Sequence, residues 1–399
     1  MHWQCRRVRL SLTSAFYIFI ALYAAGSAAS NLYDANTSVR ALGMGNAYLG
    51  VVRDADSLFY NPAGLARVSG INWLIADVKV GANGAEVMET INDIQGSSSF
   101  SDTINSLYGD HVWLGAGAKS AFTLPYLGVS VYDSLDAMLD VNNPMYPNLD
   151  ISAVNDYGYA IGGAIPLLPT MHIGTVIKYI QRTGSRVPFG PSFVGSLDPD
   201  TIMESVETKG RGYSMDLGLN LLIPGPVSPV MSFVWRNVGV TSFKAESLTL
   251  AAPPRDLDEM SLGLALNLDA GLVTVNPAFD FRYLNRSDVQ LGKKVHFGVE
   301  IGLPLIDIRA GFNQGYYTAG VGLNLGIIRM DAATYGEELG AYPGQREDRR
   351  YMLQFSLELG FDPISGTLGG GSGGSSSSSA SKSSSGGGGR RGPRLKQRR

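Results

Sequence analysis

Cysteine is almost absent from this sequence. Cys5 is the one cysteine among 399 residues, and it lies ahead of the first apolar stretch. A chain processed after that stretch has no thiol, which excludes disulfide cross-links and structural thiolate metal sites. Because Cys5 precedes the apolar stretch instead of ending it, a lipoprotein cleavage site is not supported either.

Long apolar runs are also scarce. The N-terminal stretch 16–25 falls far short of the roughly 20 residues that a membrane-spanning helix needs, and no later run reaches that length. Arg6, Arg7 and Arg9 precede this stretch, and the small residues 26–30 follow it. This order is typical of a secretory signal peptide, so we expect residues 1–29 to be removed on export.

Charge is low for a chain of this size. Only 17% of the residues are charged, against about 25% in soluble proteins. Low charge without apolar helices suits a barrel whose outer face meets lipid. The body carries about −12, which excludes nucleic acid as a partner, and the tail about +6.

The tail begins at Asp362 and is rich in Gly and Ser, so we predict that residues 362–399 form a disordered extension. Its basic residues gather at the very end: Arg390, Arg391, Arg394, Lys396, Arg398 and Arg399. They could meet an anionic cell-wall polymer or an acidic partner by charge alone, or the tail could be inert.

Apolar and polar residues alternate with period two through the body. In 306–313, for example, Ile306, Ile308 and Phe312 alternate with polar residues. Fourteen such segments run at 72–82, 113–123, 126–135, 156–165, 171–182, 211–223, 228–237, 258–268, 272–284, 293–303, 305–314, 316–325, 327–336 and 350–361. Runs of this length match the 9–11 residues of tilted membrane strands better than the shorter strands of soluble proteins.

The connections alternate between short links and long loops, with the Gly315 turn as the one exception, and the long loops are 84–111, 136–155, 183–210, 238–257, 285–292 and 337–349. This is the pattern of periplasmic turns and external loops. We therefore predict an all-β protein, a transmembrane antiparallel β-barrel of about fourteen strands at 71–361, in the outer membrane of a Gram-negative cell.

The segment 38–70 carries a resemblance. It contains a glycine-rich run at 43–47, Asp54-Ala55-Asp56-Ser57, and Tyr60-Asn61-Pro62-Ala63-Gly64-Leu65. In this order, before a fourteen-strand pattern, it resembles the N-terminal region of the long-chain fatty-acid transporter family of outer-membrane proteins, which includes barrels of type IX secretion.

The resemblance implies that residues 30–70 fold inside the barrel as a hatch. The hatch residues would include Gly43, Gly45, Asn61, Pro62, Ala63 and Gly64. Glycine allows tight backbone paths, and Pro62 removes a hydrogen-bond donor and stiffens its turn. A well-packed plug without any gating is an equally open interpretation.

Polar residues on the inward face of the predicted strands could line a path through the lumen: Lys178, Asp216, Asp280, Arg282, His296, Glu300, Asp307 and Arg309. Alternatively, they pair with one another and with the hatch, as polar barrel interiors do.

Two long loops carry apolar residues that could form an external hydrophobic mouth: Val87, Met88, Ile91 and Ile94 at helical spacing, and Phe189 and Phe193 farther on. They could equally pack on the barrel rim.

No nucleophile–histidine–acid arrangement stands out, so we expect no enzyme, no metal site and no cofactor. The best reading is inward transport of a hydrophobic small molecule by a barrel embedded in outer-membrane lipid, with an apolar pocket near residues 61–65. The alternative is a non-transporting barrel that anchors or shuttles secreted proteins.

Overall fold

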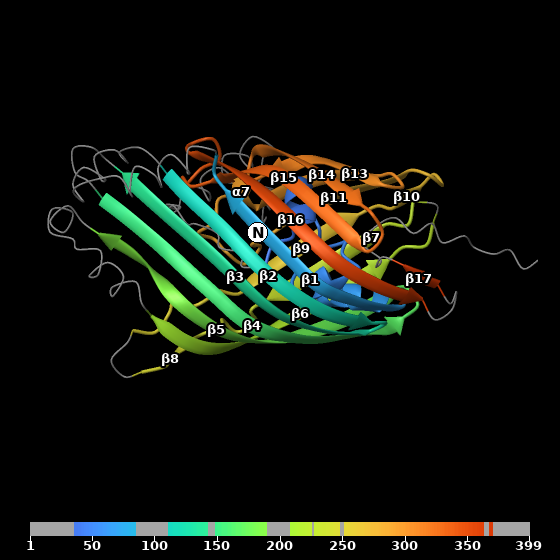
Figure 1. The fold of residues 1–399 in the computed structure, drawn as a ribbon, viewed down its shortest axis with the longest axis horizontal. Coiled ribbons are helices and arrows are strands. Elements are labelled where there is room, and N and C mark those ends of the chain that lie inside the picture. Colours follow the sequence, from blue (N-terminus) through green and yellow to red (C-terminus); the bar gives the residue numbers. More distant parts are fainter. Residues whose placement is uncertain are drawn as a thin grey trace, which may run out of the picture.

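The computed structural model describes residues 36–84, 111–142, 148–189, 208–225, 227–247, 251–362 and 367–369. Within them, fourteen strands close into an antiparallel barrel (Figure 1). They are β1 (Ile71–Ala82), β2 (His111–Leu124), β3 (Leu127–Asn142), β4 (Asn148–Leu168), β5 (Met171–Phe189), β6 (Lys209–Leu222), β7 (Val230–Arg236), β9 (Glu259–Ala265), β11 (Thr274–Phe281), β12 (Val295–Gly302), β13 (Ile306–Asn313), β14 (Tyr316–Asn324), β15 (Ile328–Glu338) and β16 (Glu347–Asp362).

The barrel is closed because β1 pairs with both β2 and β16. Every other strand of the fourteen pairs with its two neighbours in chain order. Three short strands, β8 (Lys244–Ala245), β10 (Leu268–Asp269) and β17 (Thr367–Gly369), extend this sheet at its margins. The predicted all-β barrel of fourteen strands is confirmed.

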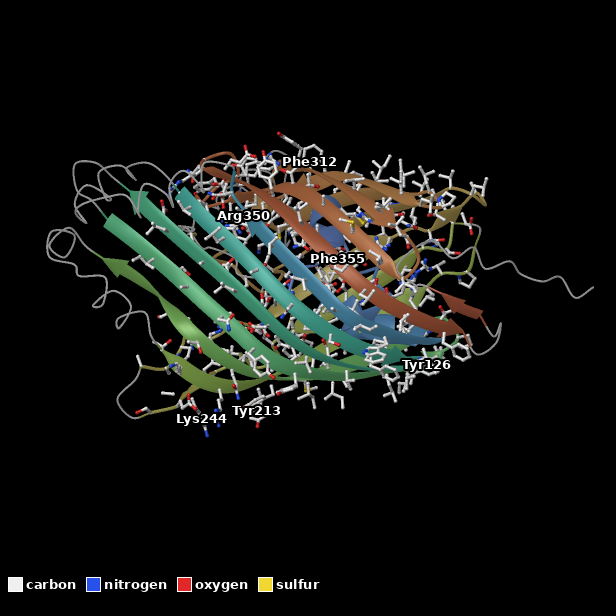
Figure 2. The ribbon with its side chains drawn as sticks, in the orientation of Figure 1. Tyr126, Tyr213, Lys244, Phe312, Arg350 and Phe355 are labelled. Carbon is white, nitrogen blue, oxygen red and sulfur yellow. The ribbon has the colours of Figure 1, made fainter. Side chains whose placement is uncertain are left out.

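Alternation along the strands separates an apolar outside from a polar inside. In β13, Ile306, Ile308 and Phe312 are exposed on the outer face, whereas Asp307 and Arg309 are buried within. Successive side chains of a strand point to opposite faces, so the sequence period dictates this division. Figure 2 shows Phe312, Phe355 and Tyr126 on the outside of the wall. An apolar outer face is what a barrel in lipid requires.

Three strands are longer than their apolar pattern predicted. The predicted loop 136–155 is mostly strand, because β3 continues to Asn142 and β4 starts at Asn148. The predicted loop 183–210 likewise begins only after Phe189. The ladder stays paired through these more polar stretches, since backbone donors and acceptors bond whatever the side chains are.

The turns at one end are short and tight. Residues 125–126 join β2 to β3, and residues 169–170 join β4 to β5. Tyr126 has a φ of 74° and Gly326, between β14 and β15, has 85°. At the other end β15 and β16 are joined by residues 339–346. The predicted alternation of short and long connections is thus present among the described residues, except that residues 314–315 alone join β13 to β14 at the long-loop end, where the sequence predicted the Gly315 exception.

At the C-terminal side, β17 falls within the part predicted to be disordered and pairs with Gly360–Asp362. Helical elements are short: α2 (Val39–Gly43), η1 (Ala55–Leu58), η2 (Pro62–Arg67) and α7 (Leu291–Lys294). Across the described ranges, no helix combines the length and apolar character needed to cross a membrane.

Candidate functional site

Residues 37–70 lie inside the barrel, and we call them the luminal segment. Its helix α2 contacts β13 to β16, whereas η2 contacts β4 to β6 on the other side of the lumen. Most of its side chains are buried, and Ser57 and Asn61 are fully buried. The segment therefore spans the lumen from wall to wall without joining the sheet.

Two side chains set the turns of the luminal segment. Asp54 caps η1 by accepting a hydrogen bond of 3.0 Å from the backbone nitrogen of Asp56. Asn61 caps η2 in the same way, accepting from Ala63 at 3.1 Å. Pro62 follows at the first helical position, where its missing N–H has no intrahelical partner to lose. The Asn-Pro pair thus begins the helix that packs on β4 to β6.

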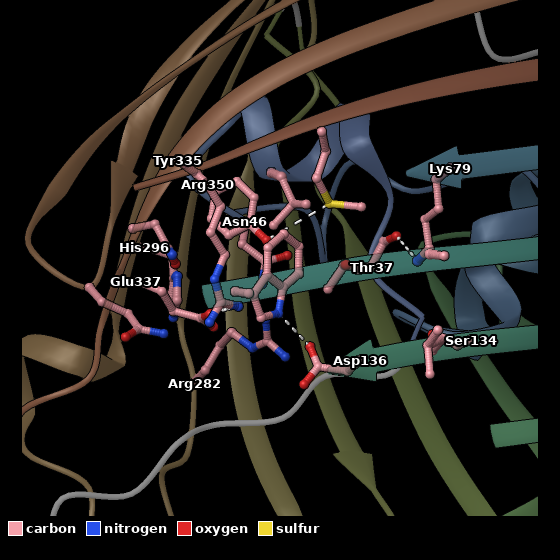
Figure 3. A pocket seen from close by; sticks show the side chains of 18 of the residues that line it. Thr37, Asn46, Lys79, Ser134, Asp136, Arg282, His296, Tyr335, Glu337 and Arg350 are labelled. Atoms are coloured by element: carbon pink, nitrogen blue, oxygen red, sulfur yellow. Dashed lines mark hydrogen bonds and ion pairs between the residues drawn. The ribbon is translucent and has the colours of Figure 1, made fainter. Parts of the chain in front are cut away.

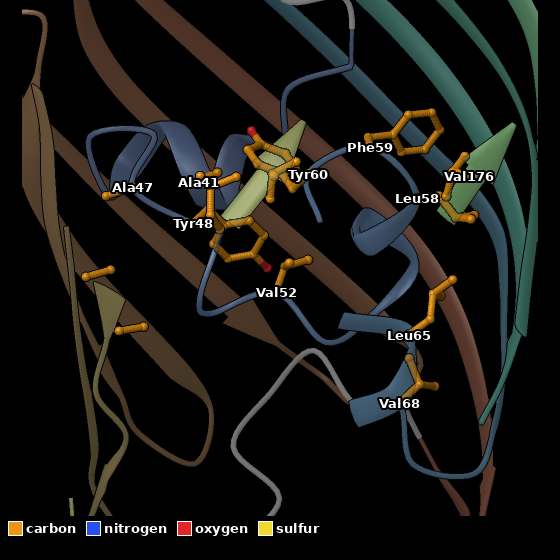
Figure 4. Packing of buried hydrophobic residues seen from close by; sticks show 14 of the residues in the cluster. Ala41, Ala47, Tyr48, Val52, Leu58, Phe59, Tyr60, Leu65, Val68 and Val176 are labelled. Atoms are coloured by element: carbon orange, nitrogen blue, oxygen red, sulfur yellow. The ribbon is translucent and has the colours of Figure 1, made fainter. Parts of the chain in front are cut away.

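Apolar side chains of the segment form the core of the molecule (Figure 4). The rings of Tyr48 and Tyr60 meet edge to face at 5.1 Å, and Phe59 meets Tyr132 of β3 at 5.2 Å. Aromatic pairs favour this geometry. The hydrophobic core thus lies in the lumen, with eleven of its eighteen buried residues from the segment and seven, mostly small, from the barrel wall.

A buried ion pair joins α2 to β12. The guanidinium of Arg40 donates to both carboxylate oxygens of Glu300, at 2.8 and 2.7 Å. Arg309 of β13 donates to the same carboxylate at 2.7 Å and also to Asp331 and Asp307. Glu300 is thereby shared between one cation of the segment and one of the wall.

Backbone nitrogens of the segment, and the side-chain amide of Asn61, also donate hydrogen bonds to the wall. The nitrogens of Tyr48 and Leu49 donate to one oxygen of Asp280, at 2.7 and 3.0 Å. The amide of Asn61 donates to Asn220 of β6 at 2.7 Å. These contacts satisfy polar groups that would otherwise be buried without partners.

On the β1–β2 side, Lys119 contacts Asp56 at 2.5 Å and lies 3.8 Å from Asp77. Burial alone would raise the pKa of Asp56, but the ammonium of Lys119 outweighs it and lowers that pKa. For Asp54, burial and the neighbouring Asp56 raise the pKa. The segment is held by charges on two separate parts of the wall.

Inward-facing glycines receive the segment. A Cβ on Gly174 of β5 would overlap the backbone of Pro62, and one on Gly218 would overlap Asn61. Opposite them, a Cβ on Gly298 would overlap Met44, and Gly43 of the segment packs on Gly320 of β14. Gly45 needs its glycine for a φ of 65°.

Among the described residues, packed side chains occupy the region near residues 61–65 where an apolar pocket was expected. Ala63 and Leu65 are fully buried, and Leu65 packs toward Gly128 and Gly162. Gly64 packs against Ser57 and Val52 within the segment itself. Each predicted hatch residue thus packs closely against the wall or against another part of the segment.

The predicted luminal polar residues face inward, and each contacts a partner. Lys178 pairs with Asp216 at 2.5 Å, and Arg282 bonds to Glu259 at 3.1 Å. A ring nitrogen of His296 lies 3.0 Å from the carbonyl oxygen of Gly45. Asp280, Glu300, Asp307 and Arg309 bond as described above. The arrangement is the paired interior that the sequence left open as an alternative.

Small cavities lie between the segment and the wall. One of about 60 Å³ lies towards the long-loop end, lined in part by Trp113, Arg282 and Arg350. Figure 3 shows Arg282, Glu337 and Arg350 gathered there. Trp113 donates to Asp136 at 2.8 Å. Cavities of about 40 and 20 Å³ lie elsewhere along the segment, and all three are polar enough to hold water.

Of the predicted external mouth, Val87, Met88, Ile91, Ile94 and Phe193 lie outside the described residues. Phe189 is the last residue of β5 and not part of a loop. Among the residues that the structure describes, no group of three or more His, Cys, Asp or Glu side chains could hold a metal ion.

Sequence reasoning missed Arg40, Lys119 and Asp331 as members of this site. Arg40 had a signal, since it is the one cation within the short apolar helix Val39–Gly43. Lys119 lies in a strand where glycine and alanine blur the alternation. Asp331 accepts from Arg309 on another strand, and nothing in the sequence around Asp331 indicates that contact.

No protein-family model and no curated protein matches the chain. Solved structures do: the toluene transporter TbuX of Ralstonia pickettii is 9% identical, with 85% of this chain and 99% of that chain covered and a TM-score of 0.46. The toluene transporter TodX of Pseudomonas putida is 11% identical, with 82% and 99% covered and a TM-score of 0.45. The outer membrane phospholipase A of Escherichia coli is 10% identical, with 74% and 96% covered and a TM-score of 0.32.

The chain is thus similar to these solved structures over most of its length. The long-chain fatty-acid transporter family remains what the segment 38–70 resembles.

Proposed function

We propose that this barrel lets hydrophobic small molecules cross the outer membrane inward, with the luminal segment acting as a hatch. The observation that carries the proposal is the way the segment is held. Side-chain ion pairs, hydrogen bonds and packing hold it, but no strand pairing does. A closure that is not part of the sheet can shift while the barrel stays intact.

The wall itself is suited to stay in place during such a shift. Its strands pair around the whole circumference, and an apolar outer face keeps it in lipid. Opening the lumen then requires breaking the Arg40–Glu300 and Lys119–Asp56 pairs and leaving the glycine contacts. A hydrophobic ligand that packs in the vacated lumen would offset part of that free energy.

Uptake by living cells tests the proposal. Cells without the gene, and the same cells carrying it again, are given radiolabelled oleate in one arm and radiolabelled toluene in another. Transport predicts that uptake of at least one probe falls without the gene and returns with it. Unchanged uptake of hydrophobic compounds in both arms would contradict the proposal.

One observation favours the alternative of a non-transporting anchor or shuttle for secreted proteins. The segment docks on glycines of both walls so closely that a single Cβ would collide, as befits a permanent plug. In that case the same knockout cells would release surface-bound secreted proteins into the medium while their uptake of both probes stayed normal.

A further inference from the structure

The outer wall carries an apolar groove over β1 to β6. It measures about 390 Å³ and is lined by Trp73, Phe122, Val129, Ile161, Ile177 and Tyr213, among others. These side chains are on the lipid-facing side and are one-third to three-quarters exposed. A hollow of this kind in an otherwise close-packed wall offers room for acyl chains.

Four tyrosines border the groove towards the long-loop end. Tyr159 stacks near Tyr179 at 6.4 Å, and Tyr179 meets Tyr213 at 5.2 Å. Tyr157 and Tyr159 share a hydrogen bond of 2.7 Å between their hydroxyls. Tyrosine favours the boundary between hydrocarbon and headgroups, where its ring is in lipid and its hydroxyl meets polar groups. This cluster therefore marks the membrane interface.

Basic side chains follow directly beyond the tyrosines. Arg211 lies two residues from Tyr213 on the same outer face of β6. Lys244 of β8 lies opposite Arg211 in the β6–β8 ladder. Lys244 is exposed, and Figure 2 places it beside Tyr213. Arg211 gives one N–H to Glu246 at 2.6 Å and is 55% exposed, which leaves further donors of its guanidinium for another acceptor.

We propose that this face binds a phosphorylated glycolipid with several acyl chains, from the outer leaflet. Its acyl chains lie in the groove, its sugars reach the tyrosines, and a phosphate meets Arg211 and Lys244. The order along the barrel axis is apolar groove, tyrosines, then cations, which matches such an amphiphile from tail to headgroup. The site lies outside the lumen and does not depend on transport.

The test titrates bis-phosphorylated lipid A onto the full purified protein in nonionic detergent and measures binding by native mass spectrometry. Each basic side chain at an anionic interface contributes roughly 1 kcal/mol, or about fivefold in affinity. Lys244→Gln should therefore weaken binding about fivefold, and Arg211→Gln with Lys244→Gln at least tenfold. Arg286→Gln neutralises a partly exposed cation between β11 and β12, away from this face, and should leave the affinity unchanged.

Lipid A without phosphates and inorganic phosphate alone form the other arms. We expect both to bind weakly, because dephosphorylated lipid A lacks the negative charge and inorganic phosphate lacks the acyl chains. All variants change exposed or partly exposed residues, and a heat-modifiable band on a gel confirms that each has folded. Equal binding of the two lipid A forms, or equal affinity of the double variant and the wild type, would overturn the proposal.

Discussion

At the scale of single residues, the lumen depends on shared buried charges. Glu300 accepts from Arg40 and Arg309, and all three residues are at least nine-tenths buried. Breaking a buried pair leaves an uncompensated charge, which is far more costly than losing an exposed pair. One carboxylate therefore links the luminal segment to β12 and β13.

Glu300→Gln removes that charge while keeping the shape. We expect it to destabilise the folded barrel by about 3 kcal/mol, measured as a lower urea midpoint of tryptophan fluorescence in lipid vesicles. Glu246→Gln breaks the exposed pair with Arg211 and is the matched control, whose midpoint should not move. Equal midpoints for the two variants would show that Glu300 is not the shared partner.

Gly174→Ala tests the docking of the segment. Its new methyl group meets the backbone of Pro62, and overpacking of this kind typically costs about 1–3 kcal/mol. Gly163→Ala on the neighbouring strand points outward, where its Cβ would lie 3.4 Å from Leu127, and it should be neutral. A Gly174→Ala protein as stable as Gly163→Ala would mean that the segment does not rest on this wall.

The sequence predicts which face a residue takes but not its partner. Period two placed Asp307, Arg309 and Glu300 inside, and the structure agrees. The pairing of Arg40 with Glu300 joins positions 260 apart, and depends on the strand register and on the path of the segment. Neither the strand register nor the path of the segment follows from the local sequence pattern, so this contact could not be predicted.

At the scale of elements, strands were predicted well where they cross the apolar band. The ends of β3 and β4 were missed although period two continues there, for example through Leu139 and Ile151, because the aspartates between these residues make both stretches polar enough to be interpreted as loop. There the ladder itself continues the strand. The turn residues and helix caps, by contrast, follow from local chemistry at Asp54 and Asn61.

The two ends of the barrel should face opposite sides of the membrane. Ala252 lies between β7 and β9 at the long-loop end, and Ala270 between β9 and β11 at the short-turn end; both are exposed. Ala252→Cys should react with a membrane-impermeant maleimide on intact cells. Ala270→Cys should react only after the outer membrane is permeabilised, and the reverse pattern would invert the orientation.

At the scale of the whole molecule, a continuous wall surrounds a segment that closes its lumen. Wall and segment meet through side chains and close backbone contacts, so the barrel can persist while the segment moves. Gly50 of the segment and Ala265 of β9 offer a place to prevent that movement. A Cβ on Gly50 would lie 2.8 Å from the Cβ of Ala265, so a separation of about 1 Å more gives the spacing of a disulfide.

The most direct test is uptake by cells that carry Gly50→Cys with Ala265→Cys. Oxidation should lock the segment and reduce uptake of the transported probe to the level of cells without the gene. Reduction should restore it, and each single cysteine should be insensitive to oxidant. Full uptake by a protein whose cross-link is complete on a gel would contradict the claim that the segment is a hatch.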